Sequence, residues 1–157
     1  MQEKKNATIQ STAIRVAIDG VVQEMKFLIE SKQILLIEQY EDQDAEIMMN
    51  EAQFQVIIRN ILSNAIKFTP PDGYIRLKTK LEYDKVVVII KDTGIGMNSE
   101  QLASVLHYPT SRQGTMQEKG TGLGLSLSKE LIEQSNGSIT LKSIPDKGTE
   151  VRLEFII

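Results

Sequence analysis

The chain has 157 residues, a formal net charge of −3 and 41% hydrophobic residues. These values are ordinary for one globular domain, and they argue against a general nucleic-acid binder, which would carry a basic patch. The absence of cysteine excludes disulfides, thiolate metal sites and a cysteine nucleophile. No apolar run approaches the ~20 residues that cross a bilayer. We therefore expect a single cytoplasmic domain over residues 1–157, with a flexible start over residues 1–11 and no direct membrane contact.

The first half of the chain carries alternating helical and strand patterns. In chain order, these patterns predict a helix over residues 12–31, strands over 32–39 and 47–49, and a helix over 51–68. Asn50 stands where a helix N-cap belongs, with Glu51 in the first turn. Pro70 and Pro71 end the second helix, because proline cannot continue one.

The second half ends in a predicted hairpin. The patterns predict strands over residues 75–81 and 85–91, short helical structure over 99–106, a helix over 123–134, and strands over 138–144 and 149–157. Leu127, Leu131 and Ile132 are expected to face inward from the third long helix. Turns are expected at Asp72–Gly73 and at residues 146–148. Helices interleaved with hairpins favour an α+β fold, with the helices layered on one face of a sheet.

Two amides and one ammonium share a stripe on the helix predicted over residues 51–68. At about 100° per residue, Asn60, Asn64 and Lys67 fall within roughly 60° of one another. An amide oxygen is a hard ligand suited to Mg²⁺, and a lysine one turn further on can neutralise phosphate charge. The alternative is a solvated helix face on which the two asparagines have no special role.

Asp92 ends the predicted central strand and is followed at once by a glycine-rich turn, Thr93–Gly94–Ile95–Gly96. A carboxylate in that position can accept a hydrogen bond from an exocyclic amine such as that of adenine. The glycines allow the backbone to approach a flat ring closely. The alternative is a tight turn capped by an aspartate.

A second glycine cluster, Gly120–Thr121–Gly122–Leu123–Gly124, precedes the helix predicted over residues 123–134. Backbone N–H groups at a helix N-terminus can hold phosphate. Neither cluster fits the dinucleotide fingerprint, and the chain contains no P-loop motif. The stretch 106–119 between the clusters is expected to form a lid, with Arg112 and Lys119 as phosphate-contacting cations. A plain surface loop is the alternative.

Taken in order, these segments resemble the ATP-binding domain of sensor histidine kinases, in the Bergerat-fold (GHKL) superfamily of ATPases and kinases. Residues 60–69 are similar to the N box of that family, residues 92–97 to its G1 box and residues 120–125 to its G2 box. Lys147–Gly148–Thr149 resembles the terminal Gly-Thr element. The resemblance extends over about residues 14–157 and implies a two-layer sandwich with a mixed, mostly antiparallel sheet.

The resemblance implies a role for individual residues. Asn64 would bind Mg²⁺ through its side-chain oxygen, Asn60 would support the metal and phosphate, and Lys67 would meet phosphate; these three are the predicted catalytic residues. Asp92 would read the adenine amine. The predicted ATP-binding residues are Asn60, Asn64, Lys67, Phe68, Asp92, Gly94, Gly96, Met97, Arg112, Lys119, Gly120, Thr121, Gly122, Leu123, Gly124, Leu125 and Thr149.

Position 60 indicates which chemistry to expect. Members of the superfamily that hydrolyse ATP resemble one another in having glutamate there as a general base, whereas Asn60 cannot take a proton. The resemblance therefore implies transfer of the γ-phosphoryl of ATP to a histidine on a separate phosphoacceptor and dimerisation domain of the same kinase, which can be membrane-anchored, with a response regulator downstream. Alternatives are a serine protein kinase of the anti-sigma type and a degenerate interaction module.

Two features depart from the family pattern. The F box expects phenylalanines near residues 106–110, where the chain has Leu106–His107–Tyr108–Pro109–Thr110. His107 is the only histidine, and it lacks the acidic residue and proline that follow a phosphoacceptor histidine. We therefore expect the phosphoacceptor to lie outside this chain.

Overall fold

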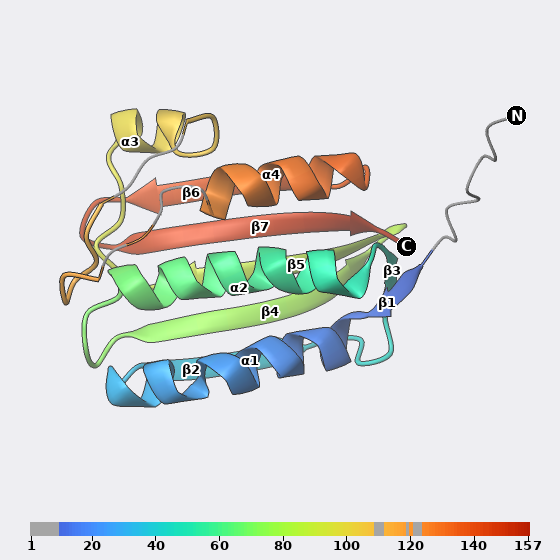
Figure 1. The fold of residues 1–157 in the computed structure, drawn as a ribbon, viewed down its shortest axis with the longest axis horizontal. Helices are drawn as coiled ribbons and strands as arrows, with labels where there is room; N and C mark the ends of the chain where they lie inside the picture. Colours follow the sequence, from blue (N-terminus) through green and yellow to red (C-terminus); the bar gives the residue numbers. More distant parts are fainter. Residues whose placement is uncertain (1–9, 109–111, 119, 121–123) are drawn as a thin grey trace, which may run out of the picture.

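The computed structural model describes residues 10–108, 112–118, 120 and 124–157. In chain order (Figure 1) the elements are β1 (Ser11–Ala13), α1 (Ile14–Ser31), β2 (Leu35–Tyr40), β3 (Glu46–Met48), α2 (Glu51–Phe68), β4 (Tyr74–Glu82), β5 (Lys85–Asp92), α3 (Ser99–Ser104), α4 (Gly124–Gln134), β6 (Ser138–Ile144) and β7 (Gly148–Ile156). None of the helices in these described ranges is long and apolar enough to span a bilayer.

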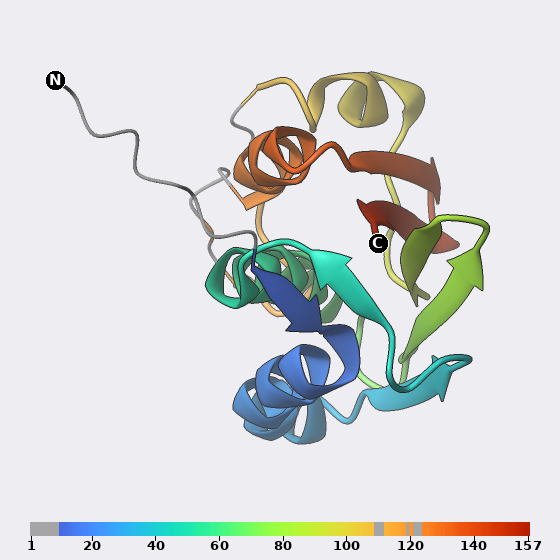
Figure 2. The ribbon, with the colours of Figure 1, turned by 90° about the vertical axis from the view of Figure 1, so that its right-hand side faces the viewer.

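The main sheet has five strands in the order β2-β4-β5-β7-β6. β2 pairs in parallel with β4, and the other three pairings are antiparallel. Seen end-on in Figure 2, helices α1, α2 and α4 form one layer beside this sheet. The prediction of an α+β sandwich, with helices on one face of a mixed and mostly antiparallel sheet, is confirmed.

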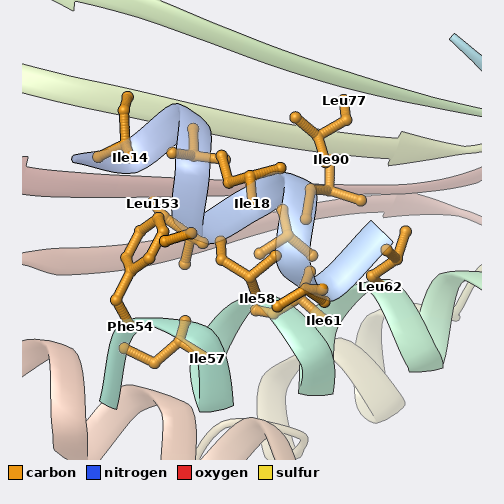
Figure 3. Packing of buried hydrophobic residues seen from close by; sticks show 14 of the residues in the cluster. Ile14, Ile18, Phe54, Ile57, Ile58, Ile61, Leu62, Leu77, Ile90 and Leu153 are labelled. Atoms are coloured by element: carbon orange, nitrogen blue, oxygen red, sulfur yellow. The ribbon is translucent and has the colours of Figure 1, made fainter. Parts of the chain in front are cut away.

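The core lies between the helix layer and the sheet (Figure 3). Ile14 and Ile18 of α1 point into it at helical spacing, and the ring of Phe54 from α2 meets that of Phe155 from β7 edge-on, with centroids 5.1 Å apart. The sheet contributes alternate residues of its inner face, such as Leu77 and Ile90. This packing fixes α2 across the middle of the sheet, which is what positions its polar stripe.

The helix predicted over residues 12–31 begins two residues later than predicted, at Ile14, because residues 11–13 form strand β1, paired antiparallel with β3. The hydroxyl of Thr12 donates to the carbonyl of Met49, 2.6 Å away. The predicted strand 32–39 also begins late. Lys32 caps helix α1, and Gln33 has a positive φ of 59°, so β2 starts at Leu35.

The prediction that Leu127 faces inward is wrong, since its side chain is 42% exposed. Ser128 and Ile132, one turn apart and both fully buried, form the inner face of α4, and Leu131 is only partly buried. The Ser128 hydroxyl donates to the carbonyl of Gly124 at 2.8 Å, which satisfies it inside the core. A hydroxyl that bonds its own helix can be buried at low cost, and hydrophobicity alone does not predict this.

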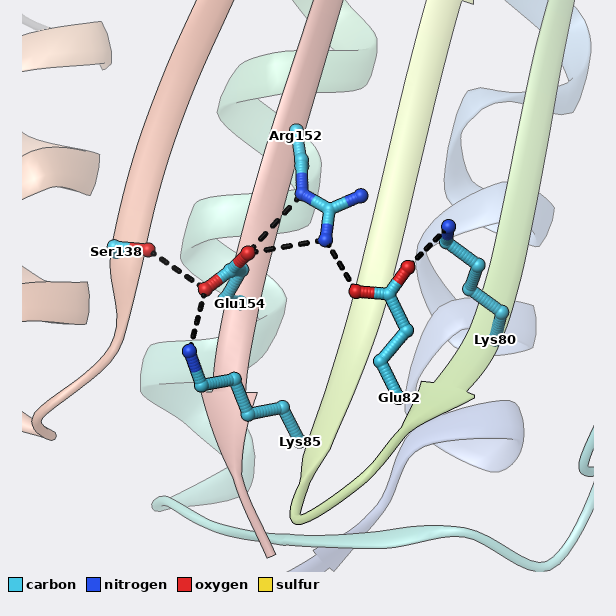
Figure 4. Close-up of polar contacts among 6 residues, drawn as sticks. All are labelled: Lys80, Glu82, Lys85, Ser138, Arg152 and Glu154. Atoms are coloured by element: carbon cyan, nitrogen blue, oxygen red, sulfur yellow. Dashed lines mark hydrogen bonds and ion pairs between the residues drawn. The ribbon is translucent and has the colours of Figure 1, made fainter.

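Charged side chains cover the outer face of the sheet (Figure 4). Arg152 donates to Glu154 at 3.0 Å and also contacts Glu82, at 2.6 Å, and Lys85 lies 3.0 Å from Glu154. Beneath them Val87, paired with Lys80 and Glu154 across the strands, is fully buried although it points outward. The aliphatic stems of the charged residues shield it. This cluster explains why β5 tolerates an unbroken apolar run.

We expect Arg152→Met to lower the melting temperature by less than about 4 °C at low salt, and by less still in concentrated salt. The hydrogen bond from Lys85, and then that from Arg152, hold the pKa of Glu154 below its usual 4.5. The contribution of this cluster to the stability of the fold is therefore present above pH 4.5. It is lost as the pH falls through the lowered pKa of Glu154. Calorimetric scans at several salt concentrations and pH values measure the difference in melting temperature. Equal melting temperatures of wild type and Arg152→Met at every salt concentration would contradict this prediction.

Candidate functional site

A cavity of about 380 Å³ opens between the C-terminal half of α2, the ends of the central strands and the start of α4. Eleven of the predicted ATP-binding residues line it: Asn60, Asn64, Lys67, Phe68, Asp92, Met97, Arg112, Gly120, Gly124, Leu125 and Thr149. Segments far apart in the sequence thus meet at one place. Predicted residues Lys119, Thr121, Gly122 and Leu123 lie outside the described part of the chain.

Helix α2 supplies the polar stripe. Its N-cap is Asn50, as predicted, whose side chain accepts a hydrogen bond from the backbone N–H of Gln53. The side-chain amide of Asn60 donates to the Gly124 carbonyl and to the Ser128 hydroxyl, both at 3.3 Å, and so links α2 to the start of α4. Asn64, one turn later, has no hydrogen bond to any described residue. Its amide therefore remains available to a ligand in the cavity.

Lys67 is the cation of this stripe. Its ammonium lies 4.9 Å from the centroid of the Phe68 ring. Burial lowers the pKa of Lys67; the nearby carboxylate of Glu118 opposes the shift and Arg112 adds to it. An ammonium that has lost part of its hydration and faces a second cation favours an anionic ligand such as phosphate.

Asp92 ends β5 with its side chain only 7% exposed. One carboxylate oxygen, Oδ1, accepts the backbone N–H groups of Gly94 at 2.8 Å and Thr149 at 3.2 Å. Among the described residues, none donates a hydrogen bond to the other oxygen, Oδ2. Burial raises the pKa of Asp92, while the two backbone donors and Arg112 oppose the rise. The carboxyl group is thus fixed in orientation, with one oxygen left for a donor in the cavity.

The glycine turn after Asp92 is held from two sides. The Ile95 N–H donates to the Phe68 carbonyl at 3.0 Å, and the Ile95 carbonyl accepts from Asp146 at 2.8 Å. Gly96 has a positive φ of 65°, a conformation that costs glycine nothing. Gly94 and Gly96 are not among the described lining residues, so they shape the wall of the cavity without forming its surface. Met97 follows them and does line it.

Residues 112–118, the longer of the two described parts of the predicted lid 106–119, lie against the C-terminal end of α2. The Thr115 N–H donates to the Lys67 carbonyl at 3.0 Å. Arg112 donates to the Gly96 carbonyl at 2.7 Å, and its guanidinium carbon stands 4.6 Å from the centroid of the Phe68 ring. Burial lowers the pKa of Arg112, against the pull of Asp92. The segment therefore brings a second cation to the cavity.

Sequence reasoning missed the apolar floor and one wall of the cavity. Ile90, Leu141 and Val151 come from the inner face of the sheet, where alternation predicts burial but not contact with a cavity. Helix α3 supplies Gln101 and Ser104, and its C-cap residue Val105 also lines the cavity. Its only sequence signal is the predicted helical stretch 99–106, which does not show where the helix packs.

The donor set limits how a cation could bind. No group of three or more His, Asp or Glu side chains stands together within the described ranges. A divalent cation here would have to take most of its oxygens from phosphate and water, as Mg²⁺ commonly does. The free amide of Asn64 fits that demand as a single protein ligand.

Comparison with known proteins gives the chain its family. Residues 49–156 match the family of histidine kinase-, DNA gyrase B-, and HSP90-like ATPases. The chain belongs to this family. Within the histidine kinase-type ATPase domain it is similar to the autoinducer 2 sensor kinase/phosphatase LuxQ of Vibrio parahaemolyticus, 34% identical over 123 residues, 73% of this chain and 14% of that protein. It is also similar to the sensor histidine kinase WalK of Bacillus subtilis, 30% identical over 114 residues, 70% of this chain and 19% of that protein.

Solved structures support the fold. The nucleotide-free catalytic domain of the histidine kinase ThkA superposes with a TM-score of 0.83 at 22% identity, over 95% of both chains. The full-length kinase ShkA, in complex with AMPPNP, gives 0.78 at 22% identity over 94% of this chain and 31% of that one. The family match and the two sensor kinase relatives make this chain a histidine kinase-type ATPase domain. It spans less than a quarter of the length of those two curated kinases.

Proposed function

We propose that this chain binds ATP·Mg²⁺ in the cavity at the end of α2, and donates the γ-phosphoryl to a histidine on a separate domain of a two-component sensor kinase. The proposal rests mainly on one arrangement. The amides of Asn60 and Asn64 and the ammonium of Lys67 face the same cavity as the fixed carboxylate of Asp92. A hydrogen-bond acceptor for the adenine amine and a row of polar side chains for the phosphates are thus available at one site.

Asp92 would orient the base. Its Oδ2 would accept the exocyclic amine of adenine, a contact that guanine, with a carbonyl at that position, cannot make. Met97, Ile90 and Val151 offer apolar surface for the ring. The phosphates would then extend along α2 toward Asn64 and Lys67, and Arg112 would stand over Phe68 at the same mouth.

Asn64 is the proposed protein ligand of Mg²⁺. When bound, the ion would neutralise charge on the phosphates and fix their orientation. We expect Asn64→Ala to weaken ATP binding by about tenfold in the presence of Mg²⁺ and to have little effect in EDTA. Titration calorimetry in both buffers measures this, with Gln53→Ala, an exposed position near the start of α2 and away from the cavity, as the control. Equal losses with and without the metal would contradict the assignment.

Asn60 favours transfer over hydrolysis. Its amide cannot accept a proton from water, and its nitrogen is already committed to Gly124 and Ser128. Catalysis would consist of positioning and charge neutralisation, so that a well-placed histidine, rather than water, attacks the γ-phosphorus in line.

Incubation with ATP labelled in the γ-phosphate tests this proposal. We expect the chain alone to release almost no labelled phosphate. Addition of the phosphoacceptor domain from the same kinase should give a labelled protein whose phosphate is acid-labile and alkali-stable, as expected of a phosphohistidine. Rapid release of free phosphate by the chain alone would contradict it. An acid-stable label on another protein would instead indicate the serine kinase alternative.

A response regulator is the proposed downstream partner. The solved complex of ThkA with the response regulator TrrA includes a chain whose fold matches this one, with a TM-score of 0.78 at 20% identity over 94% of this chain and 41% of that chain. The curated relatives named above are sensor kinases. This favours a two-component kinase with a response regulator over the serine kinase and the interaction module. We further propose a cytoplasmic location, where ATP and a response regulator are both available.

A further inference from the structure

The C-terminal end of α2 is closed by residues from distant parts of the chain. A helix leaves its last carbonyls without intrahelical donors. In α2, the carbonyls of Ile66 and Lys67 accept the ammonium of Lys32, at 2.7 and 3.0 Å. The Lys67 carbonyl also accepts the N–H of Thr115 at 3.0 Å. The helix end that carries Lys67 into the cavity is therefore stabilised from α1 and from the 112–118 segment.

Lys32 lies directly after α1, and its side chain is only 6% exposed. Besides the two carbonyls, its ammonium contacts Oε2 of Glu118 at 2.7 Å, so all three of its hydrogens have an acceptor. A buried charge is tolerated only when it is paired in this way. The C-terminal ends of α1 and α2 lie at the same end of the molecule, on the left in Figure 1.

Glu118 folds the 112–118 segment on itself. Its other oxygen, Oε1, accepts the Met116 N–H at 2.6 Å, and its backbone carbonyl accepts that of Gly114 at 2.9 Å. Burial on its own would raise the pKa of Glu118, but the hydrogen bonds from Lys32 and Met116 outweigh it and the pKa is lowered. The carboxylate is thus ionised at neutral pH and bound to Lys32.

The two ends of this segment act at different places. Glu118 contacts Lys32, and neither of these two residues lines the cavity. Arg112 does line the cavity, and it contacts Gly96 and Phe68. Thr115, between them, bonds the last turn of α2. A contact that fixes Glu118 therefore restricts where Arg112 can stand.

We propose that Lys32 and Glu118 are positioning residues for the nucleotide site, which hold the 112–118 segment against the end of α2 and so keep Arg112 at the cavity. This inference rests on the proposed function as far as the ligand is ATP. Neither residue would touch the nucleotide.

The charges predict unequal effects for the two partners. The end of a helix carries negative partial charge, so the Glu118 carboxylate can lie there only because the Lys32 ammonium stands between them. Lys32→Met would leave a carboxylate facing two carbonyls, whereas Glu118→Gln removes the charge and keeps a polar contact. We therefore expect Lys32→Met to release the segment more completely, and the double variant to be no worse than Lys32→Met alone.

The experiment combines amide hydrogen exchange at Thr115 with ATP titration. We expect Glu118→Gln to speed exchange at Thr115 and to raise the ATP Kd about three- to tenfold, since only part of the population would hold Arg112 in place. Lys32→Met should do more. Lys26→Met, an exposed position on α1 whose ammonium is 3.9 Å from Glu30, is the matched control and should change neither quantity.

The outcomes separate this inference from the proposed function. If wild type binds ATP while Glu118→Gln leaves both Thr115 exchange and Kd unchanged, the inference is wrong and the proposed function stands. If wild type binds no ATP, the proposed function fails, and Thr115 exchange still decides whether the contact holds the segment. If Lys32→Met does not fold, Glu118→Gln and Glu118→Ala carry the test. Strictly additive effects of the two substitutions on Kd would also contradict the inference.

Discussion

Asp92→Asn is expected to weaken ATP binding by about 10- to 100-fold, or roughly 1.4 to 2.8 kcal/mol. The reason lies in the two oxygens of the carboxylate. Oδ1 already accepts the N–H groups of Gly94 and Thr149. If the new amide keeps its oxygen there, its NH₂ faces the adenine amine; if it turns round, the NH₂ faces two backbone donors. Either orientation places donor against donor.

Titration calorimetry with ATP measures this effect, and circular dichroism checks that the variant is folded. Asp84→Asn is the matched control, because Asp84 is exposed in the turn between β4 and β5. That substitution also removes one negative charge, and its affinity should equal that of wild type. A folded Asp92→Asn protein within twofold of wild type would remove Asp92 from the adenine site.

Gly148→Ala is expected to cost about 2 to 4 kcal/mol of unfolding free energy and to disrupt the adenine end of the site. Gly148 begins β7 with a positive φ of 120°, which side-chain-bearing residues rarely adopt. A Cβ there would also press on the Asp92 carbonyl group, lying 2.9 Å from its carbon, and would lie 3.1 Å from the Gly94 nitrogen. Relief requires β7 to move, which breaks the Thr149 hydrogen bond to Asp92.

Urea denaturation measures the loss of stability. Gly20→Ala is the contrasting control: a Cβ there would meet only the side-chain nitrogen of Gln55, at 3.1 Å, within helix α1. Alanine is the better helix former by about 1 kcal/mol, so this variant should be as stable as wild type or slightly more stable. A Gly148→Ala protein as stable as wild type would show that the turn into β7 adapts, contrary to this expectation.

Local signals in the sequence were sufficient for most of the fold. Helix α2 has the bounds predicted from its N-cap at Asn50 and its apolar period. Strand β6 also has its predicted bounds, and the ends of β4, β5 and β7 differ from the prediction by no more than one residue. These elements have strong periodicity and clear turn residues. Asp72 and Asp146, with φ of 69° and 63°, occupy the predicted turns. The N-terminal residues 11–13 were not predicted correctly. Their strand β1 pairs with β3, about 35 residues away, and no local pattern identifies that partner.

The part of the site that the sequence motifs contain was predictable. Residues from all three polar segments line one cavity, as their order and spacing indicated. The contacts of Lys32 were not predictable. The sequence predicts only that it begins a strand, and the packing of α1 beside α2 buries it. Side-chain partners across the fold, such as Lys32 with Glu118, follow from tertiary packing, which periodicity does not encode. The residue roles proposed for ATP and Mg²⁺ remain predictions.

Amide chemical-shift mapping during titration with ATP and Mg²⁺ tests the central claim most directly. If the three segments form one nucleotide site, the largest shifts will fall on residues 60–68, 92–97, 120 and 124–125, and on the neighbouring residues 112–118 and 148–149. The amides of Lys80, Lys85 and Arg152 on the outer face of the sheet will then remain unmoved. Shifts centred on that outer face or on α1, with the amides of Asn64 and Asp92 unchanged, would contradict the account.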